Sequence, residues 1–192
     1  APADGLLISS YPPEPALEGL TIAQIAKQKG KDPASTLMDM TQRSEALGAG
    51  DSVMGTSMRT DDVAALIAWP HANICSDGAS SSRHPRGYGS FTKVLRVYVR
   101  EQKLFSLEEA IHKMTGLAAA HVGIADRGVI RPGAFADLVL LDPATVADRS
   151  TIEQPEARSI GIREVWVNGV AVLDDGEATG AYPGQAIRRA QK

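Results

Sequence analysis

Apolar residues recur at three- and four-residue spacing in several stretches of the chain, and this spacing places them on one face of a helix. The clearest stretch runs from Phe91 to Glu101, where Val94, Leu95 and Tyr98 share a face. We therefore predict an amphipathic helix there. Similar patterns predict helices from Thr21 to Gly30, from Asp32 to about Thr41, from Thr60 to Pro70, from Ser106 to Met114 and from Leu117 to Val122.

The ends of these helices carry residues that start or stop helices for local physical reasons. Asp32 can accept hydrogen bonds from the first amides of a helix, and Pro33 is preorganised for the first helical position. Ser106 and Glu109 have the spacing of a capping box. Gly30 can adopt the left-handed conformation that ends a helix. These signals predict helix boundaries without reference to tertiary packing.

Three short segments, Leu6–Ser10, Val53–Met58 and Asn73–Gly78, are predicted to be strands. Strand, helix and strand follow one another within few residues, which favours parallel β/α units and an α/β fold. From about residue 124, turn residues alternate with β-rich runs. The run from 165 to 172 contains Asn168-Gly169, the pair typical of a two-residue hairpin turn. We therefore predict a β-rich segment over residues 124–192.

The composition of the chain makes several classes of protein unlikely candidates. The chain has 192 residues, 43% of them apolar, and a net charge of −3, so it offers no basic surface for nucleic acid. No apolar run approaches the ~20 residues of a spanning helix, and no signal peptide is apparent. One cysteine, Cys75, suits a reducing compartment, so we expect a soluble, cytoplasmic protein. The start at Ala1, without an initiator Met, suggests the interior of a longer protein.

Asp77 is the first candidate for chemistry. It falls at the C-terminal end of the predicted strand Asn73–Gly78, and a polar loop rich in Ser, Arg and His follows. In parallel α/β folds, catalytic groups collect at the C-terminal ends of strands. By position alone, a turn cap beside Gly78 is the commoner role for such an aspartate, so both interpretations stay open at this point.

The sequence resembles the N-acyl-D-amino-acid deacylases (D-aminoacylases) of the amidohydrolase superfamily over about residues 70 to 185. The motifs that carry the resemblance are Cys75-Ser76-Asp77-Gly78, His84-Pro85-Arg86-Gly87-Tyr88-Gly89, Lys113-Met114-Thr115-Gly116-Leu117, Asp126-Arg127-Gly128, Ala136-Asp137-Leu138-Val139-Leu140-Leu141-Asp142 and Val165-Trp166-Val167-Asn168-Gly169. These motifs are long and specific.

This resemblance implies the C-terminal part of a (β/α)8 amidohydrolase barrel over residues 1–123, followed by a segment of a small β-rich domain over 124–192. It also implies zinc-dependent hydrolysis of the amide bond of N-acyl-D-amino acids. The main zinc ligands of such enzymes lie on earlier barrel strands, and the four histidines of this chain lack the His-x-His spacing of those ligands. The chain is therefore expected to be inactive alone and to need the N-terminal portion of the enzyme as its partner.

The resemblance also implies roles for individual residues. Asp77 would transfer the proton during hydrolysis, and it could contact the metal directly. Arg86 would bind the α-carboxylate of the substrate, for which its planar fork is suited; Arg83 is a second candidate. Tyr88 would line the substrate pocket, and Ser9 could donate a hydrogen bond to the substrate carboxylate.

Two alternatives remain open at the level of sequence. The first is another amidohydrolase reaction, on cyclic amides or D-dipeptides. The second is a noncatalytic module that binds a partner through an exposed strand edge, of which Leu6–Ser10 is the candidate.

Overall fold

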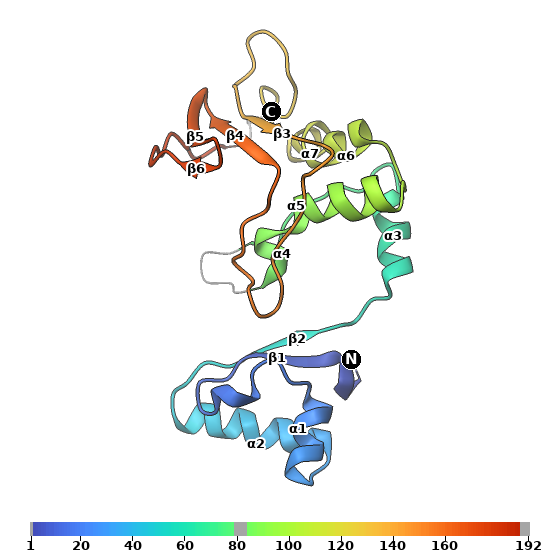
Figure 1. The fold of residues 1–192 in the computed structure, drawn as a ribbon, viewed down its shortest axis with the longest axis vertical. Coiled ribbons are helices and arrows are strands. Elements are labelled where there is room, and N and C mark those ends of the chain that lie inside the picture. Colours follow the sequence, from blue (N-terminus) through green and yellow to red (C-terminus); the bar gives the residue numbers. More distant parts are fainter. Residues whose placement is uncertain (1, 79–83, 189–192) are drawn as a thin grey trace. The chain divides into compact units, whose positions relative to one another are not determined.

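The computed structural model describes residues 2–78 and 84–188, which fold as a mixture of helices and antiparallel strands (Figure 1). The described chain forms two compact units, residues 1–60 and residues 61–192. Within the described residues, no helix has both the length and the apolar character needed to cross a membrane.

The first unit contains a two-stranded sheet, β1 (Leu6–Ser10) and β2 (Ser52–Gly55). The two strands are antiparallel, with Leu7 opposite Met54. The prediction of parallel pairing was therefore wrong for these strands. A parallel pair needs a crossover that returns the chain in the same direction, whereas the two helices between β1 and β2 bring it back in the opposite direction.

Helices α1 (Ile22–Lys29) and α2 (Pro33–Ala46) connect these strands and lie on one side of the ribbon (Figure 1). The Thr21 hydroxyl accepts from Gln24 N, and the Gln24 side chain accepts from Thr21 N, which completes a capping box. Gly30 ends α1 with φ +62°, in the left-handed region, as predicted. The Asp32 carboxylate accepts from Ser35 N at the start of α2, again as predicted.

Apolar residues from β1 and from both helices of the first unit meet in one core. Ile8 comes from β1, Ile22 and Ile25 from α1, and Met40 from α2. Tyr11 is also buried, and its hydroxyl donates to the Met40 carbonyl at 3.3 Å, so its one polar atom is satisfied inside the core. Short 3-10 turns, η1 (Ala3–Gly5) and η2 (Pro15–Leu17), complete the unit.

The second unit begins with helices. They are α3 (Thr60–Ala68), whose first residue lies at the unit boundary, α4 (Pro85–Tyr88), α5 (Ser90–Lys93), the π-helical segment η3 (Val94–Glu101), α6 (Leu107–Met114) and α7 (Gly116–Val122). The predicted amphipathic helix from Phe91 to Glu101 is confirmed as the continuous pair α5 and η3, and Val94, Leu95 and Tyr98 are buried. Ser106 caps α6 by accepting from Glu109 N.

A four-stranded antiparallel sheet follows, in the order β3 (Leu138–Leu141), β4 (Ile162–Val167), β5 (Val170–Asp174) and β6 (Glu177–Ala178). Asn168 and Gly169 join β4 to β5, and both have positive φ, which confirms the predicted hairpin. All four strands lie after residue 124. The boundary between residues 123 and 124 that the sequence suggests for the whole protein stays a prediction.

The core of the second unit joins the helices to this sheet. Ile74, Val94, Leu95, Tyr98, Phe105, Ala110 and Val146 form a buried cluster, against which Leu141 and Ile162 of the sheet also pack. Gly161 shows how closely the chain approaches this core. A Cβ at this position would lie 2.5 Å from both Val146 Cα and Val146 N.

In the described part of the chain, the segment Asn73–Gly78 belongs to no strand, so the strand prediction for it was wrong. A strand needs a neighbouring chain to accept its backbone hydrogen bonds. Among the described residues, the backbone N–H groups of this segment instead donate to carbonyls of two helices, Lys113 O of α6 and Arg86 O of α4. Ile74 of this segment is buried, and the strand pattern did not show which groups accept the hydrogen bonds of the backbone.

Candidate active site

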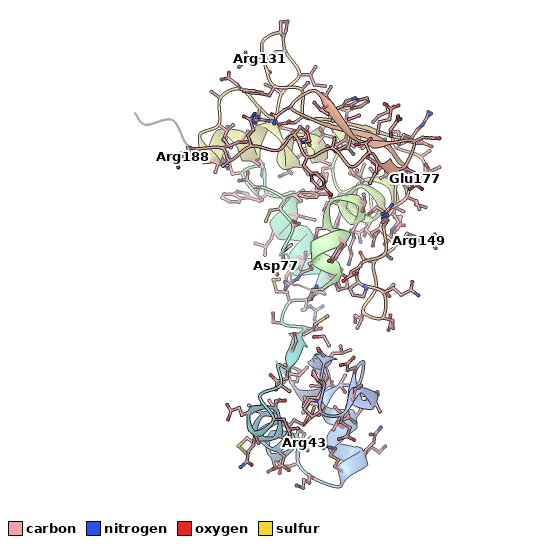
Figure 2. The ribbon with its side chains drawn as sticks, turned by 90° about the vertical axis from the view of Figure 1, so that its left-hand side faces the viewer. Arg43, Asp77, Arg131, Arg149, Glu177 and Arg188 are labelled. Atoms are coloured by element: carbon pink, nitrogen blue, oxygen red, sulfur yellow. The ribbon has the colours of Figure 1, made fainter. Side chains whose placement is uncertain are left out.

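Asp77 lies on the extended segment that follows α3, next to helix α4 (Figure 2). Ile74 anchors this segment, because its side chain is 7% exposed and its N–H donates to Lys113 O at 3.2 Å. Three residues later, Asp77 N donates to Arg86 O at 3.3 Å. The segment is thus buried at Ile74 and emerges at Asp77, where the side chain is 68% exposed.

Arg86 is placed by the short helix α4. His84 caps this helix, and its Nδ1 accepts from Arg86 N at 3.0 Å. Pro85 occupies the first helical position, where its fixed φ suits the turn. Ser90 Oγ donates to Arg86 O at 2.7 Å, so this carbonyl accepts from both Ser90 and Asp77. These local bonds fix the backbone from which the guanidinium extends.

The side chains of Asp77 and Arg86 form an ion pair, with 2.8 Å between Asp77 Oδ2 and an Arg86 terminal nitrogen. Both side chains are largely exposed, at 68% and 60%. Exposed pairs of this kind contribute only about 0–1 kcal/mol to folding, so the pair is not needed to stabilise the unit. The pair places a carboxylate and a guanidinium together at the surface, where both can contact a small molecule.

Two glycines allow the two segments to approach each other. A Cβ at Gly87 would lie 3.3 Å from Gly78 Cα, and a Cβ at Gly78 would lie 3.4 Å from Gly87 O. These distances are close to the lower limit for side-chain contacts, so larger residues would push the segments apart. The backbone contact between Asp77 and Arg86 therefore depends on the small residues that follow each of them.

His84 is held in its neutral form. Burial lowers the pKa of His84, and the positive charge of Arg86 lowers it further, while Asp77 has the opposite effect. The neutral form agrees with the geometry, because Nδ1 must carry a free lone pair to accept the hydrogen bond from Arg86 N. His84 therefore supports the turn as a hydrogen-bond acceptor.

The loop from Ala147 to Ile160 also contacts this turn. Ser150 Oγ donates to Pro85 O at 3.4 Å, and Arg96 Nε donates to Asp148 Oδ1 at 2.7 Å. The Asp148 side chain is 12% exposed. Because Arg96 lies on η3, this ion pair fixes the loop to the helix that follows the turn.

The remaining predicted residues lie in different places. Tyr88 is the last residue of α4, 44% exposed, and so shares the turn with Arg86. Ser9 lies on β1 in the first unit, where its hydroxyl donates to Ser52 O at 3.0 Å, and its contact with the substrate stays a prediction. Arg83 falls outside the described residues. The structure thus brings together Asp77 and Arg86, and the role of Tyr88 in the substrate pocket stays a prediction.

The sequence analysis did not identify Lys113 as a buried residue, although its side chain is only 1% exposed. The apolar residues Ile111 and Met114 of α6 pack partly against the core, but the buried residues of the helix are Ala110 and Lys113. The signal was available in the sequence, because Lys113 follows Ala110 at the three-residue spacing of one helix face.

The described residues do not by themselves fit a metal ion. No group of three or more His, Cys, Asp or Glu side chains comes together within residues 2–78 and 84–188. Zinc in proteins takes three or four such ligands. Asp77 alone offers one carboxylate, which is already paired with Arg86.

A model of the Amidohydrolase family matches residues 14–173. An N-acyl-D-aspartate deacylase from Alcaligenes xylosoxydans xylosoxydans is 54% identical over 129 residues, which are 66% of this chain and 26% of the relative. A D-aminoacylase from the same organism is 39% identical over 185 residues, 95% of this chain and 37% of the relative. The chain thus spans about a quarter to two fifths of the length of these curated relatives.

A solved structure shows the same fold over most of the chain. It is the N-acyl-D-glutamate deacylase from Bordetella bronchiseptica, in complex with zinc and a phosphonate inhibitor that mimics the tetrahedral intermediate of the reaction. It is 38% identical, and the match has a TM-score of 0.78 and covers 92% of this chain and 37% of that structure.

Proposed function

The chain belongs to the Amidohydrolase family, and on this premise we propose that it forms the C-terminal part of a zinc-dependent enzyme that hydrolyses the amide bond of N-acyl-D-amino acids. The relatives support the reaction, because their names record deacylation of N-acyl-D-aspartate and N-acyl-D-glutamate. The short coverage of those relatives supports the second part of the proposal, that further polypeptide completes the enzyme.

In this proposal, residues 1–123 form the last part of a (β/α)8 barrel and residues 124–192 contribute to a small β-rich domain. Support comes from the similarity to a solved deacylase over 92% of the chain. The helices α3 to α7 precede residue 124 and the strands β3 to β6 follow it, which agrees with this division.

One observation carries the assignment of the site: the Asp77 carboxylate and the Arg86 guanidinium lie 2.8 Å apart at an exposed position. An N-acyl amino acid presents a carboxylate one carbon away from its amide nitrogen. A cation beside a proton acceptor matches that arrangement, since the cation binds the carboxylate while the acceptor faces the amide. In this arrangement, Tyr88 forms part of the pocket wall.

The chemistry of this chain in the reaction is a proton transfer. Hydrolysis breaks the amide C–N bond, joins the oxygen of a water molecule to the acyl carbon, and adds a proton to the leaving nitrogen. The Asp77 carboxylate accepts a proton from that water and delivers it to the leaving amine. Arg86 holds the α-carboxylate so that the amide stays within reach of Asp77.

Zinc is the proposed cofactor, because the solved deacylase binds it. The described residues do not form a zinc site, so in this proposal the metal is held mainly by the portion of the enzyme outside this chain. That portion is the partner on which activity depends.

The test uses the complete enzyme containing this chain. N-acetyl-D-aspartate, N-acetyl-D-glutamate and N-acetyl-D-leucine are supplied separately, and release of the free D-amino acid is measured by chiral chromatography. Activity should disappear with a zinc chelator and return with added zinc. Hydrolysis of cyclic amides or D-dipeptides, with no release from any N-acyl-D-amino acid, would reject the proposal.

A further inference from the structure

Lys113 is a buried cation that the proposed reaction does not use. Its side chain is 1% exposed, and its Nζ lies 4.0 Å from the Glu109 carboxylate and 6.0 Å from the centre of the Phe105 ring. Burial of an ammonium group is costly unless the group has specific partners. Methionine would fill similar space without that cost, so apolar packing does not explain a lysine at this position.

The partners of Lys113 lie on the segment that leads to Asp77. The Lys113 ammonium donates to the backbone carbonyl of Trp69, which also accepts from Ala72 N at 3.0 Å. The backbone carbonyl of Lys113 accepts from Ile74 N at 3.2 Å. One residue of α6 therefore holds the segment at two points, Trp69 and Ile74.

Contacts with helical residues hold the segment that leads to Asp77 within the described part of the chain. The segment from Asn73 to Gly78 pairs with no strand among the described residues, and Asp77 follows Ile74 by only three residues. A second contact comes from α7, where His121 Nδ1 lies 2.9 Å from Asn73 Oδ1. The path of the chain into Asp77 is thus set by contacts with α6 and α7.

We propose that Lys113 is a positioning residue for Asp77, and that His121 assists it. This inference rests on the proposed function, because it gives Lys113 a role through the proton transfer assigned to Asp77. Loss of the ammonium removes one of the two donors to the Trp69 carbonyl, so the segment shifts and the Asp77 carboxylate leaves its position. Displacement by about 1 Å can lower a rate about 100-fold, so a modest shift should be measurable.

The experiment compares Lys113→Met with Lys93→Met in the complete enzyme. Lys93 is an exposed lysine on α5 and serves as the matched control. We expect Lys113→Met to lower kcat about 10- to 100-fold while KM changes less than about threefold, because substrate binding through Arg86 is retained. Hydrogen exchange should become faster at the amides of residues 72–77 in this variant only.

The variant Asp77→Asn distinguishes a failure of the positioning role of Lys113 from a failure of the role proposed for Asp77. If Asp77→Asn is inactive while Lys113→Met keeps a kcat within about twofold of the wild type, the positioning role is overturned and the proposed function stands. If Asp77→Asn is fully active, the role of Asp77 fails and the positioning role fails with it.

If Lys113→Met does not fold, His121→Ala tests whether helix side chains position Asp77. His121 is exposed, so its removal leaves the core intact, yet it removes the contact with Asn73. We expect a fall in kcat of about threefold or more with KM unchanged. An unchanged kcat together with unchanged exchange at residues 72–77 would overturn the proposal that helix side chains position Asp77.

Discussion

Arg86 contacts Asp77 in two ways. Its guanidinium lies 2.8 Å from the Asp77 carboxylate, and its backbone carbonyl accepts from Asp77 N at 3.3 Å. The second contact joins two backbones, so it persists when either side chain is replaced. Substitutions at these two positions should therefore change the chemistry of the site more than the path of the chain.

Asp77→Asn removes the proton acceptor but keeps the size of the side chain. We expect kcat for an N-acyl-D-amino acid to fall by about 10²- to 10⁴-fold in the complete enzyme, which is the usual contribution of a general acid or base. Steady-state assays of D-amino-acid release measure this. Asp148→Asn is not a suitable control, because Asp148 pairs with Arg96; the exposed Glu177→Gln is suitable and should be unchanged. Wild-type kcat in Asp77→Asn would contradict the assigned role.

Arg86→Lys keeps the positive charge but loses the planar fork. An ammonium group cannot form two parallel hydrogen bonds to a carboxylate, and loss of one charged hydrogen bond weakens binding by about tenfold. We therefore expect KM for N-acyl-D-amino acids to rise by about that factor, with a smaller change in kcat. The exposed Arg158→Lys is the matched control.

A substrate analogue in which a carboxamide replaces the α-carboxylate completes this test. It should bind equally weakly to the wild type and to Arg86→Lys. If Arg86→Lys weakened the carboxamide and the carboxylate alike, Arg86 would not be the group that binds the carboxylate.

The turn that holds Arg86 should weaken in acid because of His84. Burial lowers the pKa of His84 below its ordinary value of 6.5, so the unfolded chain takes up a proton at higher pH than the folded chain. The stabilising effect of neutral His84 is present above pH 6.5 and is lost as the pH falls from there through the folded-state pKa.

This pH dependence is measured by urea unfolding between about pH 7.5 and 5.5, the range in which histidine titrates. His84→Asn provides the comparison, because its side-chain oxygen can cap the turn but does not titrate. The loss of stability over this range should be smaller in the variant than in the wild type. Equal losses would show that His84 is not responsible.

Gly161→Ala should destabilise the second unit severely. Gly161 has φ +78°, and a Cβ there would lie 2.5 Å from the backbone of Val146, a core residue. Gly133→Ala is the matched control, since φ is +84° but nothing lies within 4 Å of its Cβ. We expect about 1–2 kcal/mol for the control, from the left-handed backbone alone, and a clearly larger loss at Gly161. Thermal or urea unfolding compares them, and equal losses would contradict the packing argument.

Local signals in the sequence were sufficient for the helix ends and the hairpin. The bonds at Thr21 and Ser106 and the turn at Asn168-Gly169 join residues at most a few positions apart. Their partners are therefore visible in a short stretch of sequence. Arg86 and Tyr88 also lie close together in the sequence, so their position in one helical turn could be predicted from it.

The pairing of distant segments could not be predicted from short stretches of sequence. Strands β1 and β2 are separated by two helices, and the apolar pattern of a strand is the same for parallel and antiparallel neighbours. Asn73–Gly78 has the composition of a strand, yet its backbone bonds to Lys113 and Arg86. Which partner satisfies a backbone group depends on the packing of the whole unit.

The amino-acid sequence by itself determined the helices, the hairpin and the identity of Asp77 and Arg86 as candidates, because residue types and short spacings carry that information. The tertiary structure alone decided that Asp77 meets Arg86 and that the buried Lys113 holds the segment leading to Asp77. Residues 69 and 113 are far apart in the chain, and only the burial of α6 against the core brings them into contact.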